Sequence, residues 1–419
     1  MKRILIVGGG FAGLWSALGA ARKLDEAQAT SDVEVVLVNP TAHHSIRVRN
    51  YEDDLDATLV PLVDVLEPAG VRWIRGSATH IDAAARTVTI DTDGKATSVA
   101  YDKLVLASGS HLAYAPVEGL AVHAFDVDTY EGARRLEQHL ATVVREDGAG
   151  KRTVIVIGAG LTGVELAAEL PSRLRALVAA QGGHADQQAS RVILVDRTSL
   201  IASAMGGAQP VIEQAMTEMG VEMMPGVDIK RVDSTGITLA DGTHIEAATV
   251  VWCGGMRASP LAECFPVERD ALGRLPVDKN MQVDGVANVF AAGDVARALF
   301  EDGKHASVMS CQHGRPMGRF AGHNVAADLL GLPMLPLDID WYTTIVDLGP
   351  WGAVYTEGWD RKLAAQGQLA KKVKQVINCE RIYPPRTGVR ADLFKAAEPS
   401  VQAPPPIGKQ TSVDASAEG

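Results

Sequence analysis

The sequence predicts an α/β protein in which two copies of one strand-helix-strand unit each build a parallel sheet. In each copy, a short run of apolar, mostly β-branched residues precedes a cluster of glycines, and residues with helical periodicity follow. A second apolar strand follows each helix, and parallel strands joined in this way require a right-handed crossover. The copies comprise strands at 3–7 and 153–157, helices at 14–24 and 164–174, and second strands at 33–38 and 192–195.

The length of 419 residues is enough for about two to three domains with separate cores. Apolar residues make up 47% of the chain and charged residues 22%, which is typical of folded proteins and not of disordered ones. The net charge of −11 argues against a dedicated, non-specific nucleic-acid binder. No uncharged, glycine-free run reaches the roughly 18 residues of a membrane span, so we do not expect the chain to cross a bilayer.

The four cysteines lack the spacing of a disulfide framework or of a CxxC metal pair, which favours a reducing, cytoplasmic setting. No histidines and acids have metal-ligand spacing, so we expect no metal site. The chain starts with the basic and then apolar character of an export signal. Because glycines from Gly8 to Gly13 interrupt the apolar run, a strand and glycine turn is the better interpretation.

Short alternating strands with turn residues lie between and after the duplicated units. Residues 87–90 precede Asp93-Gly94 and residues 237–239 precede Asp241-Gly242, which predicts an antiparallel hairpin in each half. Residues 341–355 are rich in aromatic and β-branched side chains around Gly349-Pro350, which predicts a further hairpin.

Two more strands correspond between the halves, at 103–107 and at 249–252. The first ends in Ser108 and Gly109, and the second is followed by Gly254 and Gly255 after one cysteine. This second correspondence supports an internal duplication. The duplicated units suggest one nucleotide site in each half, and we expect these four residues to contribute to the two sites.

The glycines at 8 to 13 form the pattern GxGxxG between a strand and a helix. In such a pattern Gly8 permits the tight turn, Gly10 lets the backbone approach a pyrophosphate, and Gly13 lets helix and strand pack closely. The pyrophosphate would lie on unpaired amides at the helix start, near Phe11 and Ala12. A glycine turn without a ligand is the alternative, but the strand, the helix and the position all favour a dinucleotide site.

The second copy repeats this pattern, and its predicted binding residues are Gly158, Gly160, Leu161, Thr162 and Gly163. Its second strand ends in Asp196, and a carboxylate there accepts hydrogen bonds from both ribose hydroxyls and repels a 2′-phosphate. NADH is therefore favoured over NADPH, although the adjacent Arg197 could reduce the preference. The first copy has Asn39 at this place, which can bond a ribose hydroxyl without charge or can form only a turn.

A late strand at 288–292 ends in Gly293-Asp294. Together with the two glycine patterns and the paired strand ends, this resembles the flavoprotein oxidoreductases with two dinucleotide-binding domains, over residues 3 to about 383. The resemblance implies two Rossmann-like domains, FAD on the first glycine pattern, NADH on the second, and a bond from Asp294 to the ribityl chain. The implied domains are FAD-binding at 1–112 and 270–335, NAD(P)H-binding at 113–269, a C-terminal module at 336–396 and a flexible tail at 397–419.

Disulfide reductases of this superfamily carry a CxxxxC pair soon after the second strand, but residues 40–51 contain no cysteine. A dithiol relay at that place is therefore excluded. The run WCGGMRASP at 252–260 is similar to the WTAGVxASP of the type II NADH dehydrogenases. That family has Gln-Gln-Gly on the quinone side of the flavin, and this chain has Gln312, His313 and Gly314 at the aligned positions.

The resemblance implies catalytic roles for three side chains. Glu165 would be the carboxylate beside the nicotinamide, with a helix-start acid favoured by the helix dipole as the alternative. Protons for the acceptor would come through His313, which can titrate near neutrality, or through a water held by Gln312. Both could equally be polar packing under the flavin. Cys311 has no identifiable partner, so buried packing is the better interpretation for it.

Residues 361–396 hold nine Lys and Arg against two acids. Leu369, Ala370 and Val373 fall on one helical face and lysines fall on others, which is typical of a basic amphipathic helix that can lie on an anionic membrane. The type II NADH dehydrogenases attach to membranes by such a region. The alternatives are that this face packs on the protein's own hairpin or on a second subunit, with an aromatic hairpin as the dimer surface.

The sequence thus predicts an FAD-dependent enzyme that oxidises NADH and passes electrons to a quinone. The expected location is the cytoplasm, and peripheral attachment to the cytoplasmic face of the membrane is left open. A reductase of a small electron carrier or another small-molecule acceptor is the second interpretation. A redox sensor that holds FAD and NADH without turnover is the third.

Overall fold

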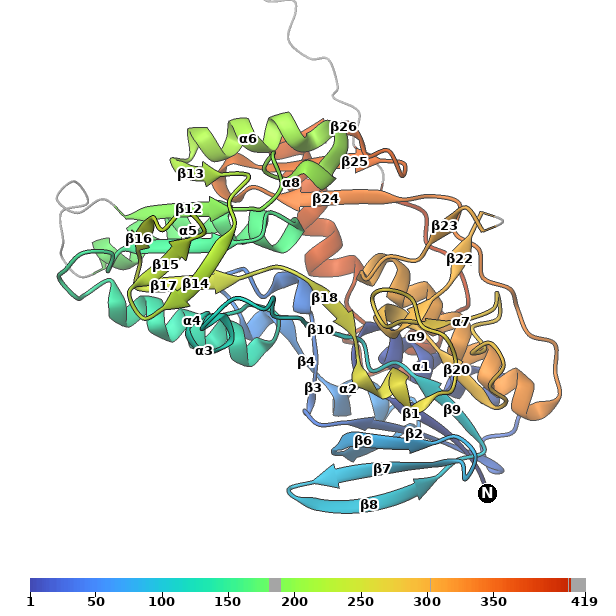
Figure 1. Cartoon of the computed structure of the whole chain (residues 1–419). Coiled ribbons are helices and arrows are strands. Elements are labelled where there is room, and N and C mark those ends of the chain that lie inside the picture. Colours follow the sequence, from blue (N-terminus) through green and yellow to red (C-terminus); the bar gives the residue numbers. More distant parts are fainter. Residues whose placement is uncertain (181–189, 302, 406, 408–419) are drawn as a thin grey trace, which may run out of the picture.

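The computed structural model describes residues 1–180, 190–301, 303–405 and 407 (Figure 1). It confirms the predicted fold class, because two parallel sheets form from the duplicated units. In the first sheet all neighbours are parallel, in the order β20-β9-β1-β2-β5. Its strands are β1 (Lys2–Val7), β2 (Val33–Asn39), β5 (Arg72–Arg75), β9 (Lys103–Leu106) and β20 (Val289–Ala291). The strand β20 thus returns from a distant part of the chain to pair with β9.

The second sheet has the order β13-β12-β11-β17 and is also parallel. Its strands are β11 (Thr153–Ile157), β12 (Arg191–Val195), β13 (Val221–Met224) and β17 (Thr249–Trp252). Helices α4 (Tyr130–Val143), α5 (Leu161–Ala179) and α6 (Gln209–Glu218) belong to this half. Its apolar strands are almost fully buried, as expected for a parallel sheet covered on both faces.

Helix α1 (Phe11–Glu26) packs closely against α7 (Cys311–Leu330). The close approach depends on glycine, because a Cβ atom at Gly318 would lie 2.4 Å from the carbonyl oxygen of Ala12. A Cβ at Gly322 would lie 2.2 Å from that of Ser16. This contact brings the start of α7 next to the first glycine turn.

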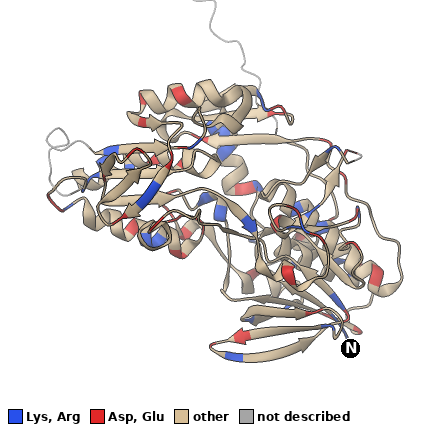
Figure 2. Ribbon diagram, viewed as in Figure 1, with Lys and Arg blue, Asp and Glu red and all other residues tan. Residues whose placement is uncertain are grey.

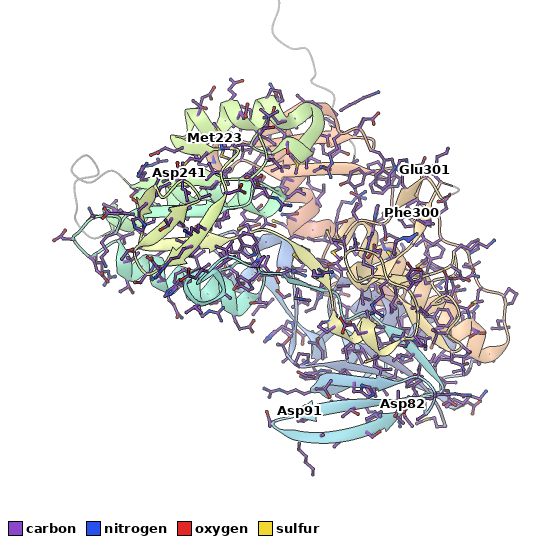
Figure 3. All side chains as sticks on the ribbon, viewed as in Figure 1. Asp82, Asp91, Met223, Asp241, Phe300 and Glu301 are labelled. Carbon is purple, nitrogen blue, oxygen red and sulfur yellow. The ribbon has the colours of Figure 1, made fainter. Side chains whose placement is uncertain are left out.

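The predicted hairpins are confirmed as two three-stranded antiparallel sheets. Asp91 accepts a bond from the amide of Gly94 in one turn, at 3.1 Å, and Asp241 accepts one from Thr243 in the other, at 2.9 Å (Figure 3). The strands are β6 (Ser77–Asp82), β7 (Thr87–Thr92) and β8 (Lys95–Ala100), then β14 (Ile229–Asp233), β15 (Gly236–Leu239) and β16 (His244–Glu246). A short pair, β10 (Ser110–Leu112) with β18 (Met256–Ala258), joins the two halves.

The C-terminal part contains the predicted hairpin, β24 (Thr343–Asp347) and β25 (Ala353–Glu357), with β26 (Lys362–Gln366) added to it. Helix α8 (Gly367–Val376) packs on this sheet and buries Ala370 and Val373. Of the alternatives for the basic helix, the structure therefore favours packing on the protein's own hairpin. These two side chains are not available to a membrane.

The predicted tail is wrong in its first part. Helix α9 (Arg390–Ala396) is followed by the fully buried Ala397, and Val401 packs against the core of the first half. Arg381 donates a bond to the carbonyl of Ala403 at 2.6 Å. Residues 406 and 408–419 of the predicted tail lie outside the described residues.

Basic and acidic residues are interspersed along the ribbon of both halves (Figure 2). Among the helices of the described residues, none is long and apolar enough to pass through a bilayer.

Candidate active site

The first glycine turn has the geometry that a dinucleotide site needs. Gly8 has φ of +107°, a conformation that L side chains rarely adopt. A Cβ at Gly13 would lie 1.8 Å from the carbonyl oxygen of Gly8, so only glycine lets α1 start this close to the strand. Gly10 precedes α1, and no side chain caps the helix. The first-turn amides, including those of Phe11 and Ala12, are therefore available to an anion.

The second glycine turn has nearly the same geometry as the first. Gly158 has φ of +104°, and a Cβ at Gly163 would lie 1.8 Å from the carbonyl oxygen of Gly158. Gly160 precedes α5 with no side-chain cap, so the amides of Leu161 and Thr162 are available as well. The duplication inferred from sequence thus extends to the local backbone.

The side chains at the two strand ends also correspond. Asn39 accepts a bond from the amide of Gly9 at 2.8 Å, and Asp196 accepts one from the amide of Ala159 at 2.6 Å. Burial opposes ionisation of Asp196, but hydrogen bonds from Thr198 and Ala159 outweigh it and lower the pKa of this carboxyl. Asp196 is therefore a full negative charge beside the second glycine turn.

A third group of residues lies where the first sheet meets the start of α7. Gly293 faces Ala12, since a Cβ there would lie 2.7 Å from the Ala12 Cβ, and Gly314 lies against Gly293 and Phe11. Asp294 accepts a bond from the Ser110 hydroxyl at 2.6 Å, and burial raises the pKa of this carboxyl. The structure thus brings the predicted residues of the late strand to the first glycine turn.

The other predicted strand-end residues also lie beside the glycine turns. A Cβ at Gly8 would lie 3.0 Å from the Cα of Ser108, and one at Gly158 would lie 3.2 Å from the amide nitrogen of Gly254. Gly109 and Gly255 have φ of +69° and +74°. The Ser108 hydroxyl is buried without a partner among the described residues, so it is a donor that a ligand could use.

Arg47 belongs to this region although sequence analysis did not single it out. Its guanidinium forms an ion pair with Asp128, donates to the Ser110 carbonyl at 3.2 Å and lies 3.9 Å from Asp294. It therefore places a positive charge beside the partly buried Asp294. No local spacing signals this role, because its partners come from three separate segments.

The start of α7 carries Gln312 and His313. Gln312 accepts a weak bond from the Thr343 hydroxyl at 3.4 Å, and its Nε2 is buried without a partner among the described residues. His313 is fully buried, and its Nδ1 accepts a bond from the amide of Val308 at 2.8 Å. Burial lowers the pKa of His313 to about 4, so the expectation that it titrates near neutrality is wrong. His313 is neutral at pH 7.

The neighbouring Cys311 is a free thiol, as are the other three cysteines. Burial raises the pKa of Cys311, so the thiol stays protonated at neutral pH. This supports packing as its role. Among the described residues there is also no cluster of side chains that could hold a metal ion.

Glu165 forms a buried ion pair with Lys374 of α8. The Glu165 Oε1 accepts bonds from the Lys374 Nζ at 2.6 Å and from the amide of Asp347 at 3.0 Å. Both side chains are 7% exposed. Burial would lower the pKa of Lys374, but Glu165 outweighs burial and raises it. Sequence analysis missed Lys374 because it was assigned to the polar side of its helix.

Strand β24 connects Glu165 to the start of α7. Thr343 at one end of the strand bonds Gln312, and Asp347 at the other end bonds Glu165. These two strand residues are ~13 Å apart along the strand. Glu165 and Gln312 are thus linked to opposite ends of the same strand and are not in contact with each other.

Comparison with known proteins agrees with this geometry. A sequence profile of the pyridine nucleotide-disulphide oxidoreductase family matches residues 2–318. An NADH dehydrogenase-like protein of Mycobacterium tuberculosis is 54% identical over 97% of this chain and 100% of its own length. A type II NADH:quinone oxidoreductase of the same organism is 31% identical over 70% of this chain and 67% of its own. The structure of NDH2 from Plasmodium falciparum in complex with NADH superposes with a TM-score of 0.72 at 12% identity, over 94% of this chain and 97% of the other.

Proposed function

The chain belongs to the pyridine nucleotide-disulphide oxidoreductase family and is an NADH dehydrogenase-like flavoprotein, and from this premise we propose that it oxidises NADH through bound FAD and reduces a quinone. The observation that carries the proposal is the pair of glycine turns with the same backbone geometry, each opening a helix whose amides are uncapped. One turn for each of two dinucleotides is the simplest use of such a duplication.

We assign FAD to the first turn. The supporting observations are the partly buried Asp294, the Ser108 hydroxyl, which has no partner among the described residues, and the contact of Gly293 with Ala12 beside α1. In this assignment the group would be held by Gly8, Gly10, Phe11, Ala12, Gly13, Asn39, Ser108, Gly109, Gly293 and Asp294. When bound, FAD supplies a ring that accepts hydride and releases electrons.

We assign NADH to the second turn, where Asp196 would accept bonds from the adenosine ribose. The residues that would hold it are Gly158, Gly160, Leu161, Thr162, Gly163, Asp196, Gly254 and Gly255. The division into an FAD-binding part at 1–112 and 270–335 and an NADH-binding part at 113–269 follows from these two assignments. The return of β20 to the first sheet supports it.

The chain's own residues would orient the reactants and keep water out. Glu165 and Lys374 form a buried ion pair with no net charge. In this proposal the pair would lie beside the nicotinamide, where it would help to orient the ring and to exclude water. The Nε2 of Gln312, which has no hydrogen-bond partner among the described residues, can donate to a carbonyl oxygen of the acceptor. His313 is neutral, and with Nδ1 already used as an acceptor its Nε2 carries the proton.

A quinone is the acceptor that fits these residues best. The four cysteines are free thiols, and residues 40–51, where disulfide reductases of this superfamily carry their cysteine pair, contain none. The relative that is 31% identical is a type II NADH:quinone oxidoreductase. A neutral donor such as the Gln312 amide suits a quinone carbonyl.

The proposal is tested by anaerobic reduction followed by reoxidation. We expect NADH to bleach the flavin absorbance of the purified protein and a soluble naphthoquinone analogue to restore it much faster than oxygen does. In the Gln312→Leu variant, bleaching should be unchanged and reoxidation by quinone slower by about tenfold, the effect of one lost hydrogen bond in a dry site. Indifference to quinone would favour a protein carrier as acceptor, and bleaching without reoxidation by any acceptor would favour a sensor.

A second prediction concerns Asp196. We expect Asp196→Asn to narrow the preference for NADH over NADPH by about tenfold, because the variant keeps the shape of the side chain and removes the charge that repels a 2′-phosphate. The measurement is the ratio of apparent dissociation constants from flavin bleaching. Asp233→Asn is a matched control, since Asp233 bonds Thr235 as Asp196 bonds Thr198 but lies away from the glycine turn. An unchanged ratio in Asp196→Asn would remove Asp196 from the nucleotide site.

A further inference from the structure

A cavity of about 80 Å³ lies between α7 and the C-terminal part of the chain. Its walls include three arginines, Arg315, Arg319 and Arg381, and, among the described residues, neither Asp nor Glu. Cys311 and Gln312 from the start of α7 line the same cavity, so it adjoins the residue that we assign to the acceptor. The proposed reduction of a neutral quinone does not explain why three positively charged side chains line this cavity.

Two of the arginines are buried without an ion-pair partner in the part of the chain that the structure describes. Arg315 is 9% exposed and Arg319 is 4% exposed, and the Nε of each has no hydrogen-bond partner among the described residues. Among the residues that the structure describes, no carboxylate lies within 4.0 Å of either guanidinium. Arg319 does reach the carbonyl oxygen of Ser400, but the distance of 3.5 Å makes this a weak hydrogen bond.

The remaining neighbours reduce this imbalance but do not remove it. The ring of Trp15 lies 5.4 Å from the Arg315 guanidinium and 4.5 Å from that of Arg319, which is a favourable but weak contact. Glu398 acts on Arg319 only from a distance. Burial lowers the pKa of Arg315 to about 10 and that of Arg319 to about 9, so both remain charged at neutral pH. Burying two like charges without an anion is costly.

We propose that this cavity binds an oxyanion, a carboxylate or a phosphate group, and that Arg315 and Arg319 hold it. The planar guanidinium presents parallel N–H donors that match the oxygens of either group. The cavity is large enough for a carboxylate or a phosphate group. Val401, Gln402 and Pro405 of the C-terminal part also line the cavity, and the low exposure of Arg315 and Arg319 would keep much water from their side of the anion.

The site also specifies the acceptor, a step that rests on the proposed function. Since Gln312 lines the cavity, an acceptor bonded to Gln312 could place an acidic substituent on Arg315 and Arg319. We therefore infer that a quinone with a carboxylate substituent is reduced with a lower KM than its neutral carboxamide analogue.

The anion site is tested on the FAD-loaded protein without NADH or acceptor. Thermal unfolding is followed in acetate, in inorganic phosphate and in the neutral isostere acetamide, at constant ionic strength. We expect the two anions to raise the unfolding midpoint and acetamide to leave it unchanged. In Arg319→Gln and in Arg315→Gln, the apparent dissociation constant of phosphate should rise about tenfold or more. Arg386→Gln, an exposed arginine of the same part of the chain, is the control and should match the unaltered protein.

Three outcomes would overturn the site. Acetamide could act as well as acetate, or Arg319→Gln and Arg315→Gln could both keep the anion effect. Alternatively, anions could bind only the FAD-free protein while Arg319→Gln loses FAD, which would assign the arginines to the phosphates of FAD. A neutral quinone is tested in parallel for reoxidation, so loss of quinone reduction with anion binding intact would reject the proposed function and keep the site.

Discussion

The Gly10→Val variant should fold and purify without flavin, and the Gly160→Val variant should stay yellow and lose its reduction by NADH. Both glycines precede a helix with nearly the same backbone, φ of −72° at Gly10 and −73° at Gly160, which any residue can adopt. At neither position would a Cβ meet another atom within 4 Å. The Cβ of valine therefore strains neither turn, and the side chain fills the space where a pyrophosphate would approach the backbone.

Each variant is the control for the other, because they make the same change in the same local structure. The flavin content is measured as visible absorbance per protein, and NADH reactivity as the rate of anaerobic bleaching. We expect each loss to exceed about 100-fold, since a side chain in contact range displaces the pyrophosphate from several amide donors. A colourless Gly160→Val with a yellow Gly10→Val would reverse the assignment of FAD and NADH. Full retention in both would place the dinucleotides elsewhere.

The features that sequence analysis predicted correctly are local in the chain. Gly8 and Gly13 are required by a backbone approach within six residues of each other, and a strand, a turn and a helix follow one another directly. The hairpins around Asp93-Gly94 and Asp241-Gly242 depend likewise on short-range turn chemistry. Such features are visible without knowing which distant segments meet.

The features that it missed arise where distant segments pack together. Lys374 bonds Glu165 across 209 residues, and Arg47 bonds Asp128 across 81. One signal was nevertheless available for Lys374: it lies four residues after Ala370 and three before Ile377, which places it on the apolar face of its helix. A lysine on that face needs a buried acid, although the sequence does not say which one.

The role of His313 shows the same limit for a pKa. The sequence supports an imidazole that titrates near neutrality, because its ordinary pKa lies there. Complete burial against Phe300 and the bond from Val308 keep it neutral instead. Burial depends on the whole fold, so a pKa in a core cannot be inferred from residue type.

The Lys374→Met variant should lose about 3–5 kcal/mol of folding free energy at neutral pH, because it leaves the Glu165 carboxylate buried without its partner. Burial already raises the pKa of Glu165, and removal of the lysine raises it further. In the variant the folded state therefore binds a proton that the unfolded state has released. Its stability should be greatest below the ordinary glutamate pKa and should fall by about 1.4 kcal/mol for each pH unit above it, until the raised pKa is reached.

Urea unfolding of the FAD-loaded protein across the pH range measures this. Lys372→Met is the control on the same helix, because Lys372 is exposed and forms no ion pair with any described residue. The double variant Glu165→Met with Lys374→Met should recover most of the lost stability and lose the pH dependence, since apolar pairs often replace buried ion pairs without cost. If the double variant regains stability but bleaches slowly with NADH, the pair serves the reaction and not the fold. If the double variant regains stability and is also bleached by NADH at the rate of the unaltered protein, the pair does not serve the reaction. Glu165 then does not act beside the nicotinamide.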